Sequence, residues 1–122
     1  MDKKILIVED SEDDLLIIKR FLNKSGYNNL TTADNAEDGI KKAIEEKPDL
    51  IITDTILPGN NGFEVCRKIR EAGLKSSHKI IIQTGSIDAV DAVRAKEVGA
   101  NDYCAKTSDC GPLLEAISKL IG

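Results

Sequence analysis

The sequence predicts an α/β domain in which five parallel strands alternate with five helices. Three short apolar runs, at residues 4–8, 50–53 and 79–84, are nearly continuous rather than alternating, which is typical of strands buried on both faces of a parallel sheet. Segments with the helical period of apolar residues lie between these runs. A strand followed by a helix, repeated five times, calls for one sheet with right-handed crossovers and helices on both of its faces.

The first strand, residues 4–8, leads into a helix with a clear start and a clear end. Ser11 is the expected N-cap, with Asp14 three residues further on, and Gly26 is expected to end the helix. The apolar positions that fall on one face of this helix are Leu15, Ile18 and Leu22.

The second strand, residues 30–33, is a weaker candidate, and we expect it near an edge of the sheet. The helix that follows is expected to end before Pro48, because proline cannot continue a helix. Its apolar face is formed by Ala36, Ile40, Ala43 and Ile44.

The second half of the chain repeats this alternation. Asn61 is the expected N-cap of the third helix, and Gly99 is expected to end the fourth. The fifth strand, residues 102–105, is again a weaker candidate, and Asp109 is the expected N-cap of the fifth helix. That helix presents one apolar face, made of Leu113, Ile117, Leu120 and Ile121.

Length and composition indicate one globular domain, residues 1–122. The 122 residues are 41% hydrophobic and 31% charged, which suits a single core and leaves no length for a second one. We expect no membrane insertion, since the apolar runs are only a few residues long and a membrane span needs about twenty. The N-terminus runs straight into a strand and leaves no room for a signal peptide, so we expect a cytoplasmic location.

Charge and aromatic content argue against a nucleic-acid partner. The net charge is −4 and no Lys/Arg cluster is present, whereas neutralising phosphates requires a basic surface. Two tyrosines and two phenylalanines give no row of rings on which bases could stack. The three cysteines, Cys66, Cys104 and Cys110, lack C-x-x-C spacing. We therefore expect them to be structural residues in a reducing compartment.

Polar side chains close the predicted strands. Glu9 and Asp10 follow the first strand, Asp54 the third and Thr84 the fourth, and the fifth leads into Lys106. Ligands of open parallel sheets bind outside the carboxyl ends of the strands. These five residues are therefore expected around one crevice, although a single strand-terminal Asp or Thr often only caps the next helix.

Three carboxylates in one crevice require a positive charge among them. Carboxylates about 4 Å apart repel by roughly 4 kcal/mol per pair at an effective dielectric constant near 20. Mg²⁺ prefers hard oxygen ligands from carboxylates, water and phosphate, and with Lys106 it would balance the three negative charges. Aspartate is also a known nucleophile that forms aspartyl phosphate. The sequence thus predicts a metal-assisted phosphoryl-acceptor site.

The chain, from Lys3 to Ile121, resembles the receiver domains of bacterial response regulators. The stretches that carry the resemblance are residues 5–10, residues 48–54, Leu57-Pro58-Gly59 with Gly62, Thr84-Gly85, and residues 99–103 with Lys106. The resemblance implies a flavodoxin-like, doubly wound fold with the strand order 2-1-3-4-5. We interpret Pro58 and Gly62 as residues of loop geometry only.

The resemblance also implies the roles of the acidic residues. Asp54 would accept a phosphoryl group from a histidine kinase or phosphotransfer protein, and Asp10 with Asp54 would bind Mg²⁺, or Mn²⁺, directly. Glu9 would act through metal-bound water. The backbone carbonyl of Ile56 would be a further metal ligand.

Three further residues would couple phosphorylation to a change of shape. Thr84 and Lys106 would contact phosphoryl oxygens, and Tyr103 resembles the switch aromatic of the family. The ring is expected to turn inward and alter the face built from the fourth helix, the fifth strand and the fifth helix, which would contact a downstream protein. This is a population shift between two packings. The domain would catalyse only its own phosphorylation and dephosphorylation, and would be no enzyme otherwise.

The chain departs from the family pattern at several positions. Thr107 follows Lys106 where the family usually has proline after a cis peptide bond, and a non-proline cis bond costs about 2.5–4 kcal/mol. We therefore expect a trans or mobile loop, which bears on the placement of Lys106. Glu9 replaces the commoner Asp. Ile56 and Ser86 occupy positions that influence the phosphoryl lifetime in the family.

Three alternatives to a phosphoacceptor fit the sequence less well. A phosphatase of the haloacid-dehalogenase type would need a second Asp where Ile56 stands. An FMN-binding module would need a Ser/Thr/Gly loop after the first strand, whereas residues 9–14 are acidic and repel phosphate. A receiver-like interaction module with little regulation by phosphorylation would not need all of the main site residues.

The sequence shows no output segment after the fifth helix. We therefore expect a stand-alone domain that passes its signal to another protein by surface contact. A receiver excised from a longer protein would have the same sequence features.

Overall fold

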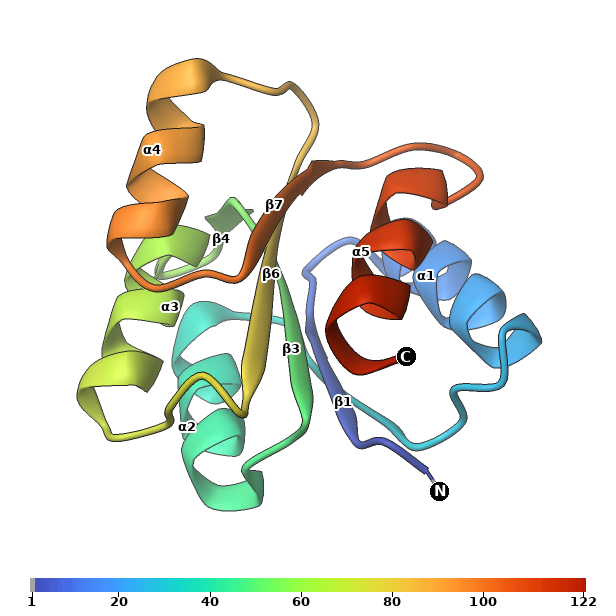
Figure 1. The fold of residues 1–122 in the computed structure, drawn as a ribbon, viewed down its shortest axis with the longest axis horizontal. Helices are drawn as coiled ribbons and strands as arrows, with labels where there is room; N and C mark the ends of the chain where they lie inside the picture. Colours follow the sequence, from blue (N-terminus) through green and yellow to red (C-terminus); the bar gives the residue numbers. More distant parts are fainter. Residues whose placement is uncertain (1) are drawn as a thin grey trace.

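The structure is a computed structural model and describes residues 2–122. Five strands form one parallel sheet in the order β2-β1-β3-β6-β7 (Figure 1). Their bounds are β1 (Ile5–Val8), β2 (Leu30–Ala33), β3 (Leu50–Asp54), β6 (Lys79–Thr84) and β7 (Asp102–Ala105). Counted within this sheet, the order is 2-1-3-4-5, so the predicted fold class and the edge position of β2 are confirmed.

Five helices cover the two faces of the sheet. Their bounds are α1 (Glu12–Lys24), α2 (Ala36–Glu46), α3 (Gly62–Glu71), α4 (Ala89–Glu97) and α5 (Gly111–Ile121). Figure 1 shows α1 and α5 on one side, and α2, α3 and α4 on the other. The predicted alternation of strands and helices along the chain is therefore confirmed.

The central strands carry two hydrophobic cores, one on each face. In β1, Leu6 and Val8 pack in the core under α2, α3 and α4, whereas Ile5 and Ile7 pack in the core under α1 and α5. Because successive strand residues point to opposite faces, a strand buried on both faces needs an unbroken apolar run. This explains the three continuous runs of the sequence.

Most of the predicted helix ends are present. The Ser11 hydroxyl accepts a hydrogen bond from the Asp14 N–H, and the Asn61 side chain accepts one from the Glu64 N–H. Gly26 and Gly99 follow α1 and α4 with φ angles of +94° and +93°, a backbone conformation that favours glycine after a helix.

The predicted N-cap of α5 was wrong by one residue. Cys110 is the N-cap, with φ +55°, and its side chain makes no capping hydrogen bond. Asp109 instead accepts hydrogen bonds from the Gly111 N–H at 2.9 Å and from the Thr107 hydroxyl at 2.8 Å. The carboxylate therefore orders the turn before the helix, which a composition-based capping rule does not distinguish from capping itself.

Two further features differ from the expectation. Ile44 is 38% exposed, because it lies at the border of the α2 stripe whose buried members include Ala36 and Ala43. A short antiparallel hairpin, β4 (Ile56–Leu57) and β5 (Asn60–Asn61), joins β3 to α3. Strands of two residues carry no hydrophobic period, so the pattern could not reveal them.

None of the helices formed by residues 2–122 has both the length and the apolar character needed to cross a bilayer.

Candidate functional site

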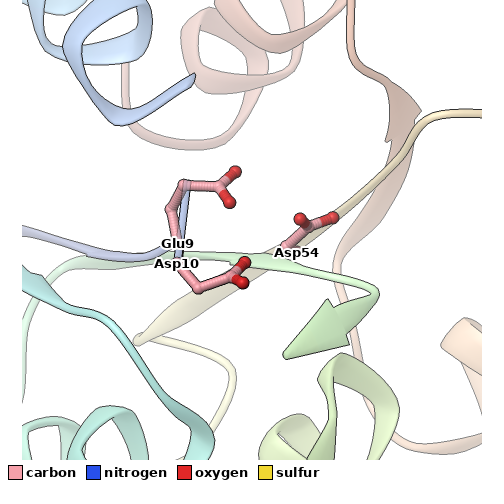
Figure 2. Close-up of side chains that lie close together, drawn as sticks. All are labelled: Glu9, Asp10 and Asp54. Carbon is pink, nitrogen blue, oxygen red and sulfur yellow. The ribbon is translucent and has the colours of Figure 1, made fainter. Parts of the chain in front are cut away.

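The carboxyl ends of β1 and β3 bring three carboxylates together. Val8 and Thr53 are paired in register, so the residues that follow them, Glu9 and Asp54, end their strands at the same level. Glu9, Asp10 and Asp54 each offer a carboxylate oxygen, and these oxygens lie within 4.8 Å of one another (Figure 2). The predicted acidic cluster is therefore formed.

The three carboxylates differ in burial. Glu9 is only 3% exposed, whereas Asp54 is half-buried and Asp10 is exposed. Burial raises the pKa of Glu9, and the nearby Asp54 charge raises it further, although a hydrogen bond from Lys106 opposes both. The cluster therefore holds unbalanced negative charge, which a cation would relieve.

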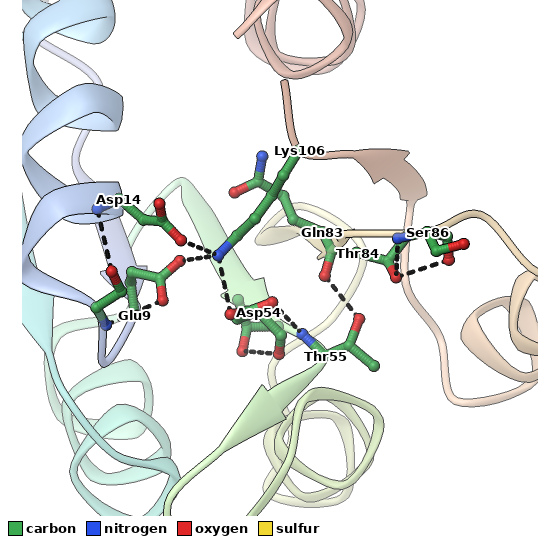
Figure 3. Close-up of polar contacts among 10 residues, drawn as sticks. Glu9, Asp14, Asp54, Thr55, Gln83, Thr84, Ser86 and Lys106 are labelled. Carbon is green, nitrogen blue, oxygen red and sulfur yellow. Dashed lines mark hydrogen bonds and ion pairs between the residues drawn. The ribbon is translucent and has the colours of Figure 1, made fainter. Parts of the chain in front are cut away.

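Lys106 is the positive group of the site. Its ammonium contacts Glu9 Oε1 and lies 2.9 Å from both Asp54 Oδ2 and Asp14 Oδ2 (Figure 3). Burial disfavours the charged lysine, but its hydrogen bonds to the three carboxylates outweigh burial and raise the pKa of Lys106. The ammonium charge is therefore retained at neutral pH.

The lysine reaches the site through a trans peptide bond. No cis bond occurs among the described residues, so the Lys106–Thr107 bond is trans. The Lys106 N–H donates to the Thr84 carbonyl at 2.7 Å, which ties the start of the following loop to β6. Thr107 in place of proline therefore leaves Lys106 at the acidic cluster.

Asp54 is held by groups on both of its oxygens. Oδ1 accepts a hydrogen bond from the Thr55 N–H at 2.8 Å, and Oδ2 accepts one from Lys106. The Thr55 hydroxyl in turn donates to the Gln83 carbonyl at 2.6 Å, which fastens the end of β3 to β6. One carboxylate oxygen is thus fixed by the backbone and the other faces the ammonium.

Gly62 also has a contact role that loop geometry alone does not describe. A Cβ at this position would lie 2.1 Å from the Asp54 carbonyl oxygen, and the Gly62 N–H donates to the Thr55 carbonyl at 2.8 Å. The N-terminus of α3 therefore packs directly on the backbone of Asp54, and only glycine fits there.

Thr84 and Tyr103 do not join the acidic cluster. The Thr84 hydroxyl donates to the Ser86 carbonyl at 2.9 Å and accepts from the Ser86 N–H at 3.2 Å, so it is engaged by its own loop. The Tyr103 ring packs partly buried against the core under α4, and its buried hydroxyl has no hydrogen-bond partner in the described chain.

Ile56 lies in the hairpin beside the site. Its side chain is 80% exposed. The role expected for its backbone carbonyl as a metal ligand stays a prediction.

Asp14 was not expected at the site as a functional group. It lies in the first turn of α1. Asp10 precedes this helix, so helical spacing does not relate the two carboxylates, and no sequence signal links Asp14 to Lys106, which is 92 residues further along the chain.

The donor set suits a hard divalent cation. Glu9, Asp10 and Asp54 supply only carboxylate oxygens, and Mg²⁺ prefers one or two such ligands together with water and phosphate. Three carboxylates and one ammonium leave two negative charges unbalanced, and a divalent cation would balance them. The arrangement can therefore bind a metal beside an aspartate whose oxygen is positioned for covalent chemistry.

Comparisons with known proteins agree with this geometry. The family model of the response regulator receiver domain matches residues 5–118. Protein PilH of Pseudomonas aeruginosa is 36% identical over 118 residues, which are 97% of this chain and 97% of PilH.

Two longer curated relatives match only in part of their length. The alkaline phosphatase synthesis transcriptional regulatory protein PhoP of Bacillus subtilis is 41% identical over 87% of this chain and 43% of its own. The response regulator ArlR of Staphylococcus aureus is 39% identical over 97% of this chain and 52% of its own. The chain thus spans about half the length of these two relatives.

Solved structures show the same fold over nearly the whole chain. Chemotaxis protein CheY4 of Vibrio cholerae superposes with a TM-score of 0.89 at 25% identity, covering 99% of this chain and 100% of that one. The receiver domain of a Pseudomonas aeruginosa sensor histidine kinase superposes with a TM-score of 0.87 at 27% identity, covering 100% and 99%. That structure is described with a magnesium ion coordinated in its active-site cleft.

Proposed function

The chain belongs to the response-regulator receiver family, and we propose that it accepts a phosphoryl group on Asp54 from a histidine kinase or phosphotransfer protein. The observation that carries this proposal is the position of Asp54. It ends β3 with one oxygen held by the Thr55 N–H and the other 2.9 Å from the Lys106 ammonium, beside two further carboxylates. In the transfer, an Asp54 oxygen forms a bond to phosphorus while the bond from phosphorus to the donor breaks.

We infer that Mg²⁺, or Mn²⁺ in its place, is the cofactor. Asp10 and Asp54 would bind it directly, Glu9 would act through metal-bound water, and the Ile56 carbonyl would be a further ligand. The support is the set of carboxylate oxygens within 4.8 Å of one another. When bound, the ion would neutralise charge on the transferring phosphoryl group.

The residues of this chain would then hold the product. The Lys106 ammonium would donate to a phosphoryl oxygen, and the Thr84 hydroxyl would leave Ser86 to donate to another. Hydrolysis at phosphorus would return the carboxylate, so the domain would catalyse only its own phosphorylation and dephosphorylation.

We propose that the output is a change on the face formed by α4, β7 and α5. Among its residues, helix α4 buries only Ala95 and exposes Val90 and Val93, and Ile87 in the loop before it is exposed as well. The unpaired Tyr103 hydroxyl adds a reason for the ring to have a second position. A downstream protein would bind this face, and the three free thiols support a reducing, cytoplasmic location.

Intact-protein mass after incubation with acetyl phosphate tests the proposal. The parent is expected to gain one phosphoryl group only with Mg²⁺, and Asp54→Asn is expected to gain none. Asp13→Asn is a matched control, because Asp13 is exposed in the first turn of α1. If the parent gained no phosphoryl group from acetyl phosphate or from a histidine-kinase donor, the chain would be an interaction module with little regulation by phosphorylation.

A further inference from the structure

Three carboxylates share one ammonium at the site, and they differ in whether they also belong to the proposed metal site. Lys106 contacts Glu9, Asp14 and Asp54. Glu9 and Asp54 belong to the acidic cluster proposed to bind the metal, whereas Asp14 does not. Asp14 is therefore the one partner of Lys106 whose carboxylate is not required for the metal.

The backbone of Asp14 is held at the start of α1. Its N–H donates to the Ser11 hydroxyl at 3.3 Å, within the N-terminal cap of α1. The side chain of Asp14 is 45% exposed and that of Lys106 is 21% exposed. Asp14 Oδ2 lies 2.9 Å from Lys106 Nζ. The pair is therefore only partly screened by water.

Loading the site would change which partner Lys106 prefers. A divalent ion among Glu9, Asp10 and Asp54 repels the ammonium, because both carry positive charge. A phosphoryl group on Asp54 adds anionic oxygens that attract it. After loading, the phosphoryl oxygens and Asp14 are the anionic partners of the ammonium that lie outside the proposed set of metal-binding carboxylates.

The structure also provides room for the second position. A cleft of about 360 Å³ adjoins Lys106 and is lined by Asp14, Ile17, Gln83, Lys106, Thr107 and Ser108. The Lys106 ammonium and the Asp14 carboxylate therefore belong to residues that border the same cleft.

We propose that Asp14 is a positioning residue that competes with the phosphoryl group on Asp54 for the Lys106 ammonium. This inference rests on the proposed phosphoacceptor function. A residue that binds the ammonium in only one of two states shifts the balance between them by its differential contact. Asp14 thus lowers the stability of the phosphorylated state and leaves the metal site intact.

The first test uses beryllium fluoride as a stable analogue of the phosphoryl group. Its Kd is measured with Mg²⁺ present for the parent, Asp14→Asn and Asp13→Asn, at about 0.15 M salt, where distant charges are screened beyond roughly 8 Å. Asp14→Asn is expected to bind the analogue about two- to five-fold more tightly, the range of a partly exposed ion pair. The charge-matched Asp13→Asn is expected to change the Kd much less.

The second test observes the lysine directly. In the parent with Mg²⁺, the Lys106 ammonium is expected to give a ¹⁵N NMR signal protected from solvent exchange. Asp14→Asn is expected to shift this signal and speed the exchange of its protons, whereas Asp13→Asn is expected to leave both unchanged.

The two tests separate failure of this inference from failure of the proposed function. Equal Kd values for Asp14→Asn and Asp13→Asn, or an unshifted Lys106 signal in Asp14→Asn, would overturn the role of Asp14. A parent that bound no beryllium fluoride would refute the phosphoacceptor function, and the ammonium signal would still show whether Asp14 holds Lys106.

Discussion

Single residues at the site are constrained by close backbone contacts as much as by charge. Gly62 is the clearest case, because a Cβ there would lie 2.1 Å from the Asp54 carbonyl oxygen. The neighbouring atom is backbone, which cannot rotate away as a flexible side chain could. The strand end that carries Asp54 must therefore move if Gly62 is replaced.

Gly62→Ala is expected to lower the free energy of unfolding by about 1–3 kcal/mol, the usual cost of overpacking. Urea unfolding monitored by circular dichroism measures the change. Gly85→Ala is the matched control, because a Cβ at Gly85 would meet no atom within 4 Å. Equal stability of the two variants would show that the contact at Gly62 relaxes freely.

The cysteines give a second residue-scale prediction, on pH. Burial raises the pKa of the Cys66 thiol to about 11, above the ordinary value of 9.0. A group whose pKa is higher in the folded state stabilises the fold fully below its unfolded pKa and loses that contribution as the pH rises toward the folded pKa. The free energy of unfolding is therefore expected to fall as the pH rises from about 9 to about 11, because Cys66 loses its stabilising contribution over this range.

Cys66→Ala tests this, since it removes the titration. Above pH 9 the free energy of unfolding of the parent is expected to fall more steeply than that of Cys66→Ala, by about 1.4 kcal/mol per pH unit. Urea unfolding at several pH values gives both slopes. Parallel slopes would mean that the thiol reaches solvent in the folded state.

At the scale of elements, two arginines on α3 differ in the kind of partner they have. Arg67 pairs with Glu64 and Glu71 on the helix surface. Within residues 2–122, Arg70 has no carboxylate partner but donates hydrogen bonds to the carbonyls of four residues and to the Asn101 side chain. The four carbonyls belong to Gly99, Leu74, Lys75 and His78. Arg70 thus ties the end of α3 to the loops before β6 and β7.

Arg70→Lys is expected to lower the free energy of unfolding by about 1–3 kcal/mol, because a lysine cannot make the same set of hydrogen bonds, three of which are partly buried. Arg67→Lys keeps a cation on an exposed surface and is expected to change stability little. Both variants carry the same Arg-to-Lys change on the same helix, and chemical denaturation compares their free energies of unfolding. A larger loss for Arg67→Lys would contradict this ranking.

The elements also show which features the sequence could predict. The strands were predictable because burial on both faces demands continuous apolar runs, as at Ile5 to Val8. The acidic cluster was predictable because parallel strands end at one edge of the sheet. The Arg70 network and the Asp14 to Lys106 pair were not, because each depends on distances between segments far apart in the chain. The fit of Gly62 against Asp54 was not either, because it depends on the path of the β4–β5 hairpin between them. The two-residue strands β4 and β5 were missed for a different reason, since they are too short for any period.

On the scale of the whole molecule, the acidic cluster is expected to lower the stability of the metal-free fold and to provide the proposed metal site. Glu9, Asp10 and Asp54 lie together with one ammonium, so the folded state without metal carries repulsion that the unfolded chain does not. A ligand that binds only the folded state stabilises it by about 2.7 kcal/mol at one hundred times its Kd. The stability of the entire domain is therefore expected to depend on Mg²⁺.

Asp10→Asn separates these two effects. Asp10 is exposed, so replacing its carboxylate by an isosteric amide is expected to disturb packing little. Without metal the variant is expected to be more stable than the parent, because one repulsive charge is gone. With Mg²⁺ the parent is expected to gain stability and the variant to gain far less, because it has lost a proposed metal ligand.

Urea unfolding with MgCl₂ or with EDTA measures all four values, and Asp13→Asn should behave as the parent does. An equal gain with Mg²⁺ in Asp10→Asn would remove Asp10 from the proposed metal site, whereas no gain in the parent would mean that the three carboxylates do not form a metal site at all.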